Sequence, residues 1–246
     1  MKRIITLLAF ISLYHLVVSA QKKYEMVIEK TDGSEIAVNV EDIVRTYFRE
    51  RSSSSCPDSN HPHMVDLGLP SGTKWACCNV GATTPEDYGN YYAWGETQPK
   101  SVYNENTYQY YNGSLSYPDS WINIGSDIAG TEYDAATANW GAPWRMPTKA
   151  QCEELFSNCT SEWTTQNGVN GRKFIGPNEA TIFLPAAGNR WNSQLSDKGS
   201  NGVYWTSMDN ESSRASASYF SFDSGEVSVF EYGMGRCYGA SVRPVR

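Results

Sequence analysis

The sequence predicts an α+β protein built mainly from short strands and β-hairpins, with a principal helix near residues 148–158 and a small β module ahead of it. Three observations support this class. Residues 64–246 are rich in Gly, Asn, Ser, Trp and Tyr and contain no long apolar run. Turn residues divide this region into short segments of strand type. Residues 148–158 alone combine a helix start signal with apolar residues at helical spacing.

The first 20 residues have the pattern of a secretory signal peptide. A charged start, Met1-Lys2-Arg3, precedes a 15-residue apolar run that closes with small residues before Gln21. The run is shorter than the about 20 apolar residues that span a bilayer. We therefore expect export to the periplasm, the cell surface or the medium, with cleavage before Gln21 and no transmembrane segment in the mature chain.

The charge of the mature chain narrows the range of partners. Residues 1–20 carry two basic residues and no acidic one, so their removal changes the formal net charge from −7 to −9. An acidic chain without a basic block disfavours nucleic acid and anionic membrane surfaces as partners. All six cysteines lie beyond residue 20. An even number of cysteines in an oxidising compartment indicates disulfides before any other role.

Residues 21–48 are predicted to form a small β-hairpin module. Apolar and polar residues alternate on both sides of Asp32-Gly33, which is a strong hairpin signal, and a further short strand is expected at 43–48. So short a segment cannot bury a stable core by itself. It either docks on the main domain or serves as an N-terminal attachment module.

Residues 49–63, "RERSSSSCPDSNHPH", have the composition of a linker. His61 and His63 lie two residues apart and could both face a metal ion if the segment were extended. No acidic or thiol cluster of matching spacing accompanies them, so solvated linker histidines are the favoured interpretation.

The main domain is predicted to span residues 64–246. Asn167-Gly168 and Asn170-Gly171 bound one turn, and Gly176-Pro177-Asn178 forms another. The segment "YFSFDSGEVSVF" predicts a hairpin that turns at residues 223–225. About 180 residues of this kind are typical of one domain.

The predicted helix begins at a capping box. Pro147 ends the preceding strand, Thr148 caps the helix, and Gln151 follows three residues later. The apolar side chains recur with helical spacing and predict one buried face, formed by Cys152, Leu155, Phe156 and Cys159. Seven residues along a helix span about 10.5 Å. Cys152 and Cys159 are therefore too far apart to form a disulfide with each other, and their side chains are expected to face the sheet.

Cys77 and Cys78 lie side by side in "KWACCNV". They do not form a C-x-x-C motif, and no histidine lies near them to complete a zinc set. If this segment is a strand, the two side chains point to opposite faces and each has its own partner. A bulge in the strand would instead place them side by side. Structural disulfides are favoured over a metal or redox site.

Several motifs together resemble one known family. They are "VDLGLPSGTKWACCNVGATTPEDYGNYYAWGE", "YDAATANWGAPWRMPTKAQCEEL", "IFLPAAGNR", "VYWTS" and "YGASVRPVR". In this order they resemble the Fibrobacter succinogenes major paralogous domain, found in secreted proteins of Bacteroidetes and related bacteria, over residues 64–246. The resemblance implies a C-type-lectin-like fold related to the formylglycine-generating enzymes, whose "RLPT-x-x-E" helix start is similar to "RMPTKAQCEEL".

The resemblance also implies a disulfide. The family's "WATCNVGA" segment has one cysteine, which matches Cys78, and its helix-end cysteine matches Cys159, so these two are expected to be bonded. Closing this 81-residue separation would stabilise the fold by about 4 kcal/mol through loop-closure entropy. Cys77 and Cys152 depart from the family pattern together, which suggests a second bond between them. Cys56 and Cys237 are then left over.

The favoured function is binding of a glycan or protein ligand outside the cell, without enzymatic activity. Two regions present ring faces and polar groups suited to this role, the tyrosine-rich insert at 103–121 and the C-terminal hairpin region. In the hairpin region the predicted ligand-binding residues are Trp205, Met208, Asp209, Asn210, Glu211, Tyr219, Tyr232, Met234, Arg236 and Tyr238. The alternative is that the tyrosines pack within their own insert and that the polar residues are ordinary solvated turns.

The family resemblance adds a possibility about this terminal region. Some lectin-fold members are diversified by retroelements in such a segment, and "RCYGASVRPVR" resembles the fixed end that follows a variable stretch. A near-copy of the corresponding bases beside a reverse transcriptase gene would reveal it.

Enzymatic activity is disfavoured on the residues available, and no catalytic residue is assigned. Formylglycine-generating enzymes hold copper with a pair of cysteines late in the fold, whereas Cys237 stands alone there. A Ser-His-Asp arrangement would need a linker histidine. Asp209 and Glu211 could act as a carboxylate pair, but nothing in the sequence supports it.

A structural role in the cell envelope is the main alternative to binding, because an exposed edge in residues 24–48 could pair with a strand of another chain.

Calcium is the one cofactor that the sequence leaves open. The Glu-Pro-Asn and Gln-Pro-Asp tripeptides of calcium-dependent lectins are absent. Asp127 and Asp134 could ligate calcium through their oxygen atoms, or could equally cap turns. No other metal site and no organic cofactor is predicted.

Overall fold

The computed structural model describes residues 25–29, 35–39 and 64–246, and the side chains of residues 64–246 except 231 and 232. The predicted signal peptide, the strand expected at 43–48, the linker and Cys56 lie outside the described residues. The chain divides into two compact units, residues 1–51 and 52–246. In the first unit, β1 (Glu25–Glu29) pairs antiparallel with β2 (Glu35–Asn39) in the register Val27 to Ala37. The predicted hairpin pairing is confirmed.

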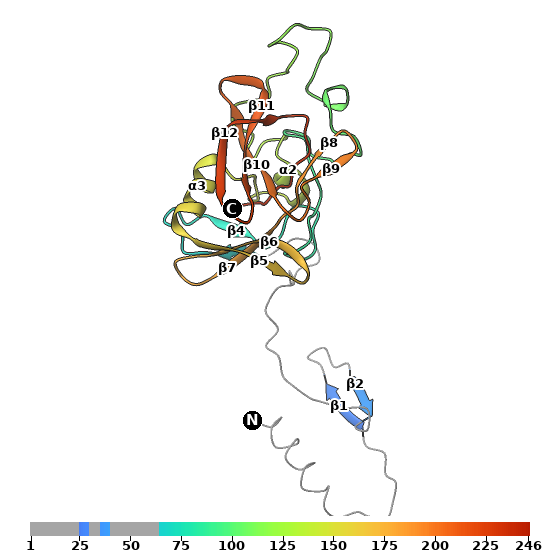
Figure 1. Cartoon of the computed structure of the whole chain (residues 1–246), viewed down its shortest axis with the longest axis vertical. Coiled ribbons are helices and arrows are strands. Elements are labelled where there is room, and N and C mark those ends of the chain that lie inside the picture. Colours follow the sequence, from blue (N-terminus) through green and yellow to red (C-terminus); the bar gives the residue numbers. More distant parts are fainter. Residues whose placement is uncertain (1–24, 30–34, 40–63) are drawn as a thin grey trace, which may run out of the picture. The chain divides into compact units, whose positions relative to one another are not determined.

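The second unit is mostly β-structure with few helices, as the sequence predicts (Figure 1). A first small sheet pairs β3 (Met64–Asp66) with β4 (Lys74–Ala76). The tyrosine-rich insert holds a short 3-10 helix, η3 (Glu105–Thr107). Two α-helices follow, α2 (Ala135–Trp140) and α3 (Lys149–Asn158).

Three further sheets follow α3, and all of their strands pair antiparallel. One contains β5 (Thr160–Gln166), β6 (Val169–Ile175) and β7 (Thr181–Pro185). The second pairs β8 (Asn189–Trp191) with β9 (Gln194–Ser196). The third contains β10 (Gly202–Asn210), β11 (Ser213–Phe222) and β12 (Val227–Gly235), in that order. Figure 1 shows this third sheet in orange and red, with α3 packed beside it.

The predicted helix is confirmed together with its start signal. The Thr148 hydroxyl accepts a hydrogen bond from the Gln151 backbone N–H, and the Gln151 side chain accepts one from the Thr148 N–H. Cys152 and Leu155 are buried, and Phe156 and Cys159 pack against the same cluster. The helix was predicted because its cap and its apolar face are both local features of the sequence.

The turns follow the predictions with one exception. Asn167 and Gly168 form the two-residue turn between β5 and β6, with φ of 47° and 84°, which suits a turn that needs positive φ at both positions. Residues 223–226 connect β11 to β12, as predicted. Asn170 and Gly171, in contrast, lie within β6 and pair with β5.

The C-terminal segment joins distant parts of the second unit. Ala240 pairs with Tyr92, Ser241 with Tyr204, and Val245 with both Trp75 and Arg145. Arg243 is fully buried, and its guanidinium donates hydrogen bonds to the side-chain oxygen of Asn79 (2.8 Å) and to the carbonyls of Ala76 (3.0 Å) and Phe183 (2.9 Å). The last residues are therefore part of the core that supports both faces of the third sheet.

Candidate functional site

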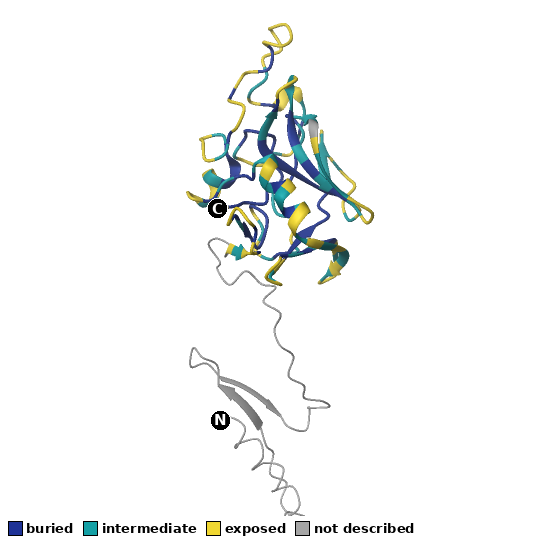
Figure 2. Cartoon of the chain, turned by 90° about the vertical axis from the view of Figure 1, so that its left-hand side faces the viewer, coloured by how far each residue is buried: buried dark blue, intermediate teal, exposed yellow. Residues whose placement is uncertain are grey.

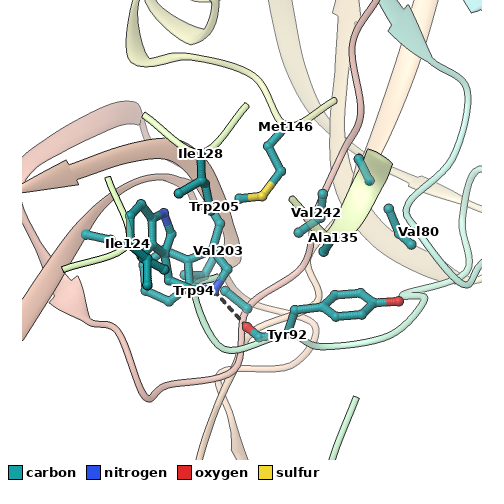
Figure 3. Packing of buried hydrophobic residues seen from close by; sticks show 13 residues of the cluster. Val80, Tyr92, Trp94, Ile124, Ile128, Ala135, Met146, Val203, Trp205 and Val242 are labelled. Carbon is teal, nitrogen blue, oxygen red and sulfur yellow. Dashed lines mark hydrogen bonds between the residues drawn. The ribbon is translucent and has the colours of Figure 1, made fainter. Parts of the chain in front are cut away.

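The third sheet is packed on both faces, and this fixes which of its side chains can meet a ligand. On one face, Tyr204 and Phe220 pack with Cys152 and Leu155 of α3. On the other face, Trp205 and a buried cluster pack together, as Figure 3 shows; the cluster includes Tyr92, Trp94, Ile124, Ile128, Met146 and Val242. Figure 2 shows buried residues both on the strands of this unit and in the segments that connect them. We call the cluster around Trp205 the second cluster. Contact with a ligand on this face is thus confined to the partly exposed side chains at its edge, which we call the rim.

Trp205 was predicted to bind ligand, and the structure places it in the core. Its side chain is 0% exposed. The indole N–H donates to the Tyr92 carbonyl at 2.7 Å, which is the dashed line in Figure 3. The prediction was wrong because the exposure of an aromatic side chain depends on whether its face of the strand is covered. Here both faces of the strand are covered.

Two rows of side chains cross the sheet on the face of the second cluster. In one row, Trp205 of β10 lies opposite Tyr219 of β11, which lies opposite Phe230 of β12. The rings of Tyr219 and Phe230 stack with their centroids 4.9 Å apart and their planes 9° apart. Phe230 is 38% exposed, and Tyr219 is half-buried. This pair therefore presents an aromatic surface at the rim, anchored on Trp205.

The second row consists of Asp209, Ala217 and Met234, again one residue from each strand. Asp209 and Met234 are half-buried and flank the buried Ala217. The Met234 sulfur accepts a hydrogen bond from the Asn189 side-chain amide at 3.8 Å. The site thus combines a thioether, an aromatic pair and a carboxylate, and methionine and aromatic side chains are typical of recognition surfaces.

Irregularities in both outer strands lie between the two rows. Three residues of β10, 206–208, and three of β12, 231–233, each lie opposite the single residue Ser218 of β11. Gly233 makes the β12 irregularity possible, since its φ is +71° and an added Cβ would lie 2.6 Å from the Ala217 carbonyl oxygen. Bulges commonly re-aim side chains near binding sites. Met208, which was predicted to bind ligand, lies in the β10 bulge and is half-buried.

Arg236 was also predicted to contact ligand, but it is a buried anchor. It is 1% exposed and lies over the Trp94 ring at 4.2 Å from the centroid. The guanidinium donates to the carbonyls of Ile122 (3.2 Å) and Arg214 (3.0 Å), and its burial lowers its pKa. Arg236 therefore joins the end of β12 to β11 and to the base of the insert rather than facing a ligand.

The other predicted binding residues differ in their exposure. Asn210 is 8% exposed, and its side-chain oxygen accepts from the Ser212 N–H at 2.9 Å, so it shapes the turn after β10 and does not face solvent as predicted. Glu211 is exposed in that turn. Tyr238 is half-buried and stacks on Trp191 with centroids 4.3 Å apart. The side chain of Tyr232 lies outside the described part of the structure.

The tyrosines of the tyrosine-rich insert pack both against one another and against the rest of the domain, so the alternative interpretation, packing within the insert, holds only in part. Tyr103, Tyr108 and Trp121 share a buried cluster with Tyr91 and Cys237. Tyr103 and Tyr108 are buried, and Tyr108 lies 5.7 Å from both Tyr110 and Trp121 between ring centroids. Burial raises the pKa of the Tyr108 hydroxyl, which donates to the Trp94 carbonyl at 2.7 Å. The tip, residues 112–119, is exposed throughout, as are residues 105–107, and Figure 2 shows a projecting exposed loop in this part of the chain.

The tip carries two of the more exposed apolar side chains among the described residues. Leu115 is 49% exposed and Tyr117 is 62% exposed. Asp119 joins the tip to β11 through an ion pair with Arg214 at 3.2 Å. The two regions proposed from the sequence are therefore linked at this point.

Asp134 has a structural role. It caps α2, and its carboxylate accepts four hydrogen bonds from backbone N–H groups, of Gly130, Ala136, Thr137 and Met146, at 2.8–3.1 Å. Burial raises its pKa, and the four hydrogen bonds oppose that shift. All of this acceptor capacity is used by the protein, so Asp134 does not fit a calcium site.

Asp127 is exposed and accepts from the Ala129 N–H at 2.9 Å. Among the described residues, no group of three or more His, Cys, Asp or Glu side chains could hold a metal ion.

The cysteines differ from the expected arrangement. β4 ends at Ala76, so Cys77 and Cys78 follow the strand, and both are buried. Cys78, Cys152 and Cys159 are thiols, so neither the Cys78–Cys159 bond implied by the family nor the second pair is formed in the structure. The Cys78 sulfur lies 3.5 Å from the Ala82 carbonyl oxygen. Cys152 belongs to the buried cluster that also contains Leu155 of α3 and Phe220 of the third sheet.

Cys237, considered for a copper site, is a buried thiol. Burial raises its pKa to about 12, which disfavours the thiolate that a metal or a nucleophilic mechanism needs. His61 and His63 lie outside the described residues.

Phe230 is the site residue that the sequence analysis missed. Its position could have been found, because the four-residue turn at 223–226 places Phe222 opposite Val227 and therefore Tyr219 opposite Phe230.

The structure defines a mainly β protein of the α+β type. No family model, curated protein or solved structure matches the chain. In the described part of the chain, no helix is long and apolar enough to cross a membrane.

Proposed function

We propose that this chain is an exported binding protein without enzymatic activity, whose second unit has a C-type-lectin-like fold and recognises a glycan or protein ligand. The observation that carries the proposal is the stacked Tyr219–Phe230 pair at the rim of the third sheet. An exposed ring face can stack on a sugar or fill a pocket of a protein, and rings held by a packed core lose little entropy on binding.

The residues around this pair support recognition over catalysis. Met208, Met234 and Asp209 adjoin it and are half-buried. Methionine and aromatic residues are enriched in the cores of interfaces. The motif resemblance to a secreted lectin-like family points in the same direction.

The direct test is binding of the purified exported protein to panels of glycans and extracellular proteins, with calcium and with a chelator. Phe230→Ala is expected to weaken the saturable binding about tenfold or more, as loss of a central aromatic contact does. Met64→Ala is the matched control, because Met64 is 42% exposed but belongs to β3. Absence of saturable binding by folded protein, or unchanged binding by Phe230→Ala, would contradict the proposal.

A second candidate function is assembly in the cell envelope through the N-terminal unit. β1 and β2 pair with each other as a two-stranded sheet, and both belong to a unit separate from the main domain. Two paired strands can accept a further strand at an outer edge. Deletion of residues 24–48 should then abolish assembly while ligand binding by the second unit survives.

A further inference from the structure

The third sheet has an open edge at β12. The strand order places β12 on the outside of the sheet, and among the described segments only β11 pairs with it. Residues 227–229 are half-buried and Phe230 is exposed, so this stretch reaches the surface. The irregularity opposite Ser218 interrupts the regular ladder beyond Phe230. The regular part of the open edge is therefore formed by residues 227–230.

The direction of the backbone groups along this edge follows from the ladder. The Asp223 N–H donates to the Glu226 carbonyl at 3.1 Å, so these two residues form a hydrogen-bonded pair. Hydrogen-bonded and non-hydrogen-bonded pairs alternate along antiparallel strands. The pairs of β11 with Val227 and with Val229 are therefore of the non-hydrogen-bonded kind. As a result, the N–H and C=O groups of Val227 and Val229 point away from β11, toward the open edge.

The other long edge strands of the second unit are covered or carry charge. β10 pairs on its outer side with the C-terminal segment near Ser241, and the Phe183 carbonyl of β7 accepts from Arg243. β5 carries the charged Glu162 near its centre. Coverage, charged residues and prolines are the usual means by which proteins prevent edge strands from pairing with other chains. Residues 227–230, Val-Ser-Val-Phe, have none of these features.

This edge is complementary to a second copy of itself. If two β12 strands pair antiparallel about Ser228, Val227 of each copy lies opposite Val229 of the other. Each of these pairs can exchange both of its N–H···O bonds, because the groups of both residues point outward. Pairing about Val229 would instead require residue 231, which belongs to the irregular segment. The register about Ser228 therefore uses only the regular part of the edge.

The side chains fit the same register. Ser228 lies opposite Ser228 of the second copy on one face of the sheet. The valine pairs lie on the other face, where Val227 and Val229 pack against the cluster that contains α3. Glu226 lies opposite Phe230, so no like charges face each other, a juxtaposition that would oppose pairing.

We infer that the chain forms a two-fold symmetric dimer, in which the β12 strands of two copies pair antiparallel about Ser228 and join the two third sheets into one. Such isologous dimers are the commonest oligomers of soluble proteins. The inference goes beyond the proposed function and does not depend on it, because it rests on the backbone and side chains of the edge. In this dimer the two Tyr219–Phe230 pairs would face the same side, and binding to a surface that carries several ligands would gain avidity.

The first test is sedimentation equilibrium of the purified exported protein at increasing concentration. We expect the mass to rise from that of one chain toward that of two. Ser228→Lys should weaken the dimer about tenfold or more, because it places two like charges directly opposite each other. Ser221→Lys is the matched control, since Ser221 lies opposite Ser228 on β11 and shares its face of the sheet. Its two ammonium groups would lie about 14 Å apart, beyond the Debye length of about 8 Å, so the dimer should persist.

The second test checks the register by cross-linking. Residues opposite each other in a non-hydrogen-bonded antiparallel pair have Cα atoms about 4.5 Å apart, which a disulfide can bridge. Ser228→Cys should therefore form a covalent dimer under mild oxidation, as non-reducing electrophoresis would show. Ser221→Cys and the unmutated protein should not form it. This test decides the question even if Ser228→Lys does not fold.

Three outcomes would overturn the inference. The first is a single-chain mass at every concentration, including the case in which β12 pairs only with a strand of a different protein. The second is a dimer that Ser228→Lys leaves unchanged, which would place the interface elsewhere, for example in the N-terminal unit. The third is equal cross-linking of Ser228→Cys and Ser221→Cys. A monomer that binds ligand and loses affinity with Phe230→Ala would refute the dimer alone, whereas a dimer without ligand binding would refute only the proposed function.

Discussion

The contrast between a ligand contact and a buried anchor can be tested at Arg236. Arg236→Met keeps most of the volume of the side chain and removes its charge and its donors. A desolvated cation–π contact contributes about 2 kcal/mol, and each hydrogen bond from a charged donor at least about 1.5 kcal/mol. Arg236 has one such contact with Trp94 and two such bonds, to the carbonyls of Ile122 and Arg214.

These contributions are partly offset, because removing the charge also removes the cost of burying it. We expect the free energy of unfolding to fall by about 4 kcal/mol, which for a domain of this size lowers the melting temperature by about 10 °C. Urea unfolding followed by circular dichroism measures the change, with an unaltered slope as a check that the unfolding remains two-state.

Arg214→Met is the matched control. Arg214 lies in β11, is exposed, and forms a single ion pair with the exposed Asp119. Surface pairs of this kind contribute less than about 1 kcal/mol. If Arg236→Met unfolds at the same urea concentration as the unmutated protein and only loses ligand affinity, Arg236 contacts ligand and the reasoning from its burial is refuted.

Three further predictions concern other parts of the fold. Asp134→Ala should lower the free energy of unfolding by about 3 kcal/mol, because it removes the cap of α2 and leaves several N–H groups unpaired. Calcium should not shift the melting temperature of the unmutated protein, and a calcium-dependent shift that Asp134→Ala abolishes would restore the calcium hypothesis. Gly233→Ala should destabilise the protein by at least about 1 kcal/mol in chemical unfolding, since its φ of +71° and its approach to Ala217 exclude a Cβ; a stabilised variant would count against the bulge in β12. Cys152 and Cys237 should resist alkylation at neutral pH in the folded protein, because burial raises the pKa of both thiols, and should react in guanidinium chloride without a reductant. Mass spectrometry would show the labelling, and labelling only after reduction would establish disulfides instead.

The elements that the sequence predicted well are those with local physical causes. The α3 helix carries its capping box and its apolar face within twelve residues, and the hairpin at 223–226 has its turn between two alternating strands. The α2 helix was missed, because its six residues show little periodicity. The sequence did indicate this helix, because Asp134 directly precedes two alanines and aspartate is a favoured N-cap residue. The residue was instead interpreted as a calcium ligand or a turn cap.

The sequence allowed residues of the candidate site to be chosen by residue type, but it did not show which of them are exposed. Composition and position identified Tyr219, Met234 and Asp209, which lie at the rim. The same criteria also selected Trp205 and Arg236, which are buried. The difference arises because the loops near residues 92–94 and 122–128 cover part of the sheet face, and these contacts are distant in sequence.

By itself, the sequence determined the class of the fold, the position and cap of the principal helix, and the hairpin that carries the site, because each depends on neighbouring residues. The tertiary structure alone decided which face of each strand is covered, how the irregularities of β10 and β12 align beside Ser218, and that the carboxylate of Asp134 accepts four backbone hydrogen bonds. Burial and electrostatic pairing are sums over segments far apart along the chain, and the order of residues does not state which segments meet.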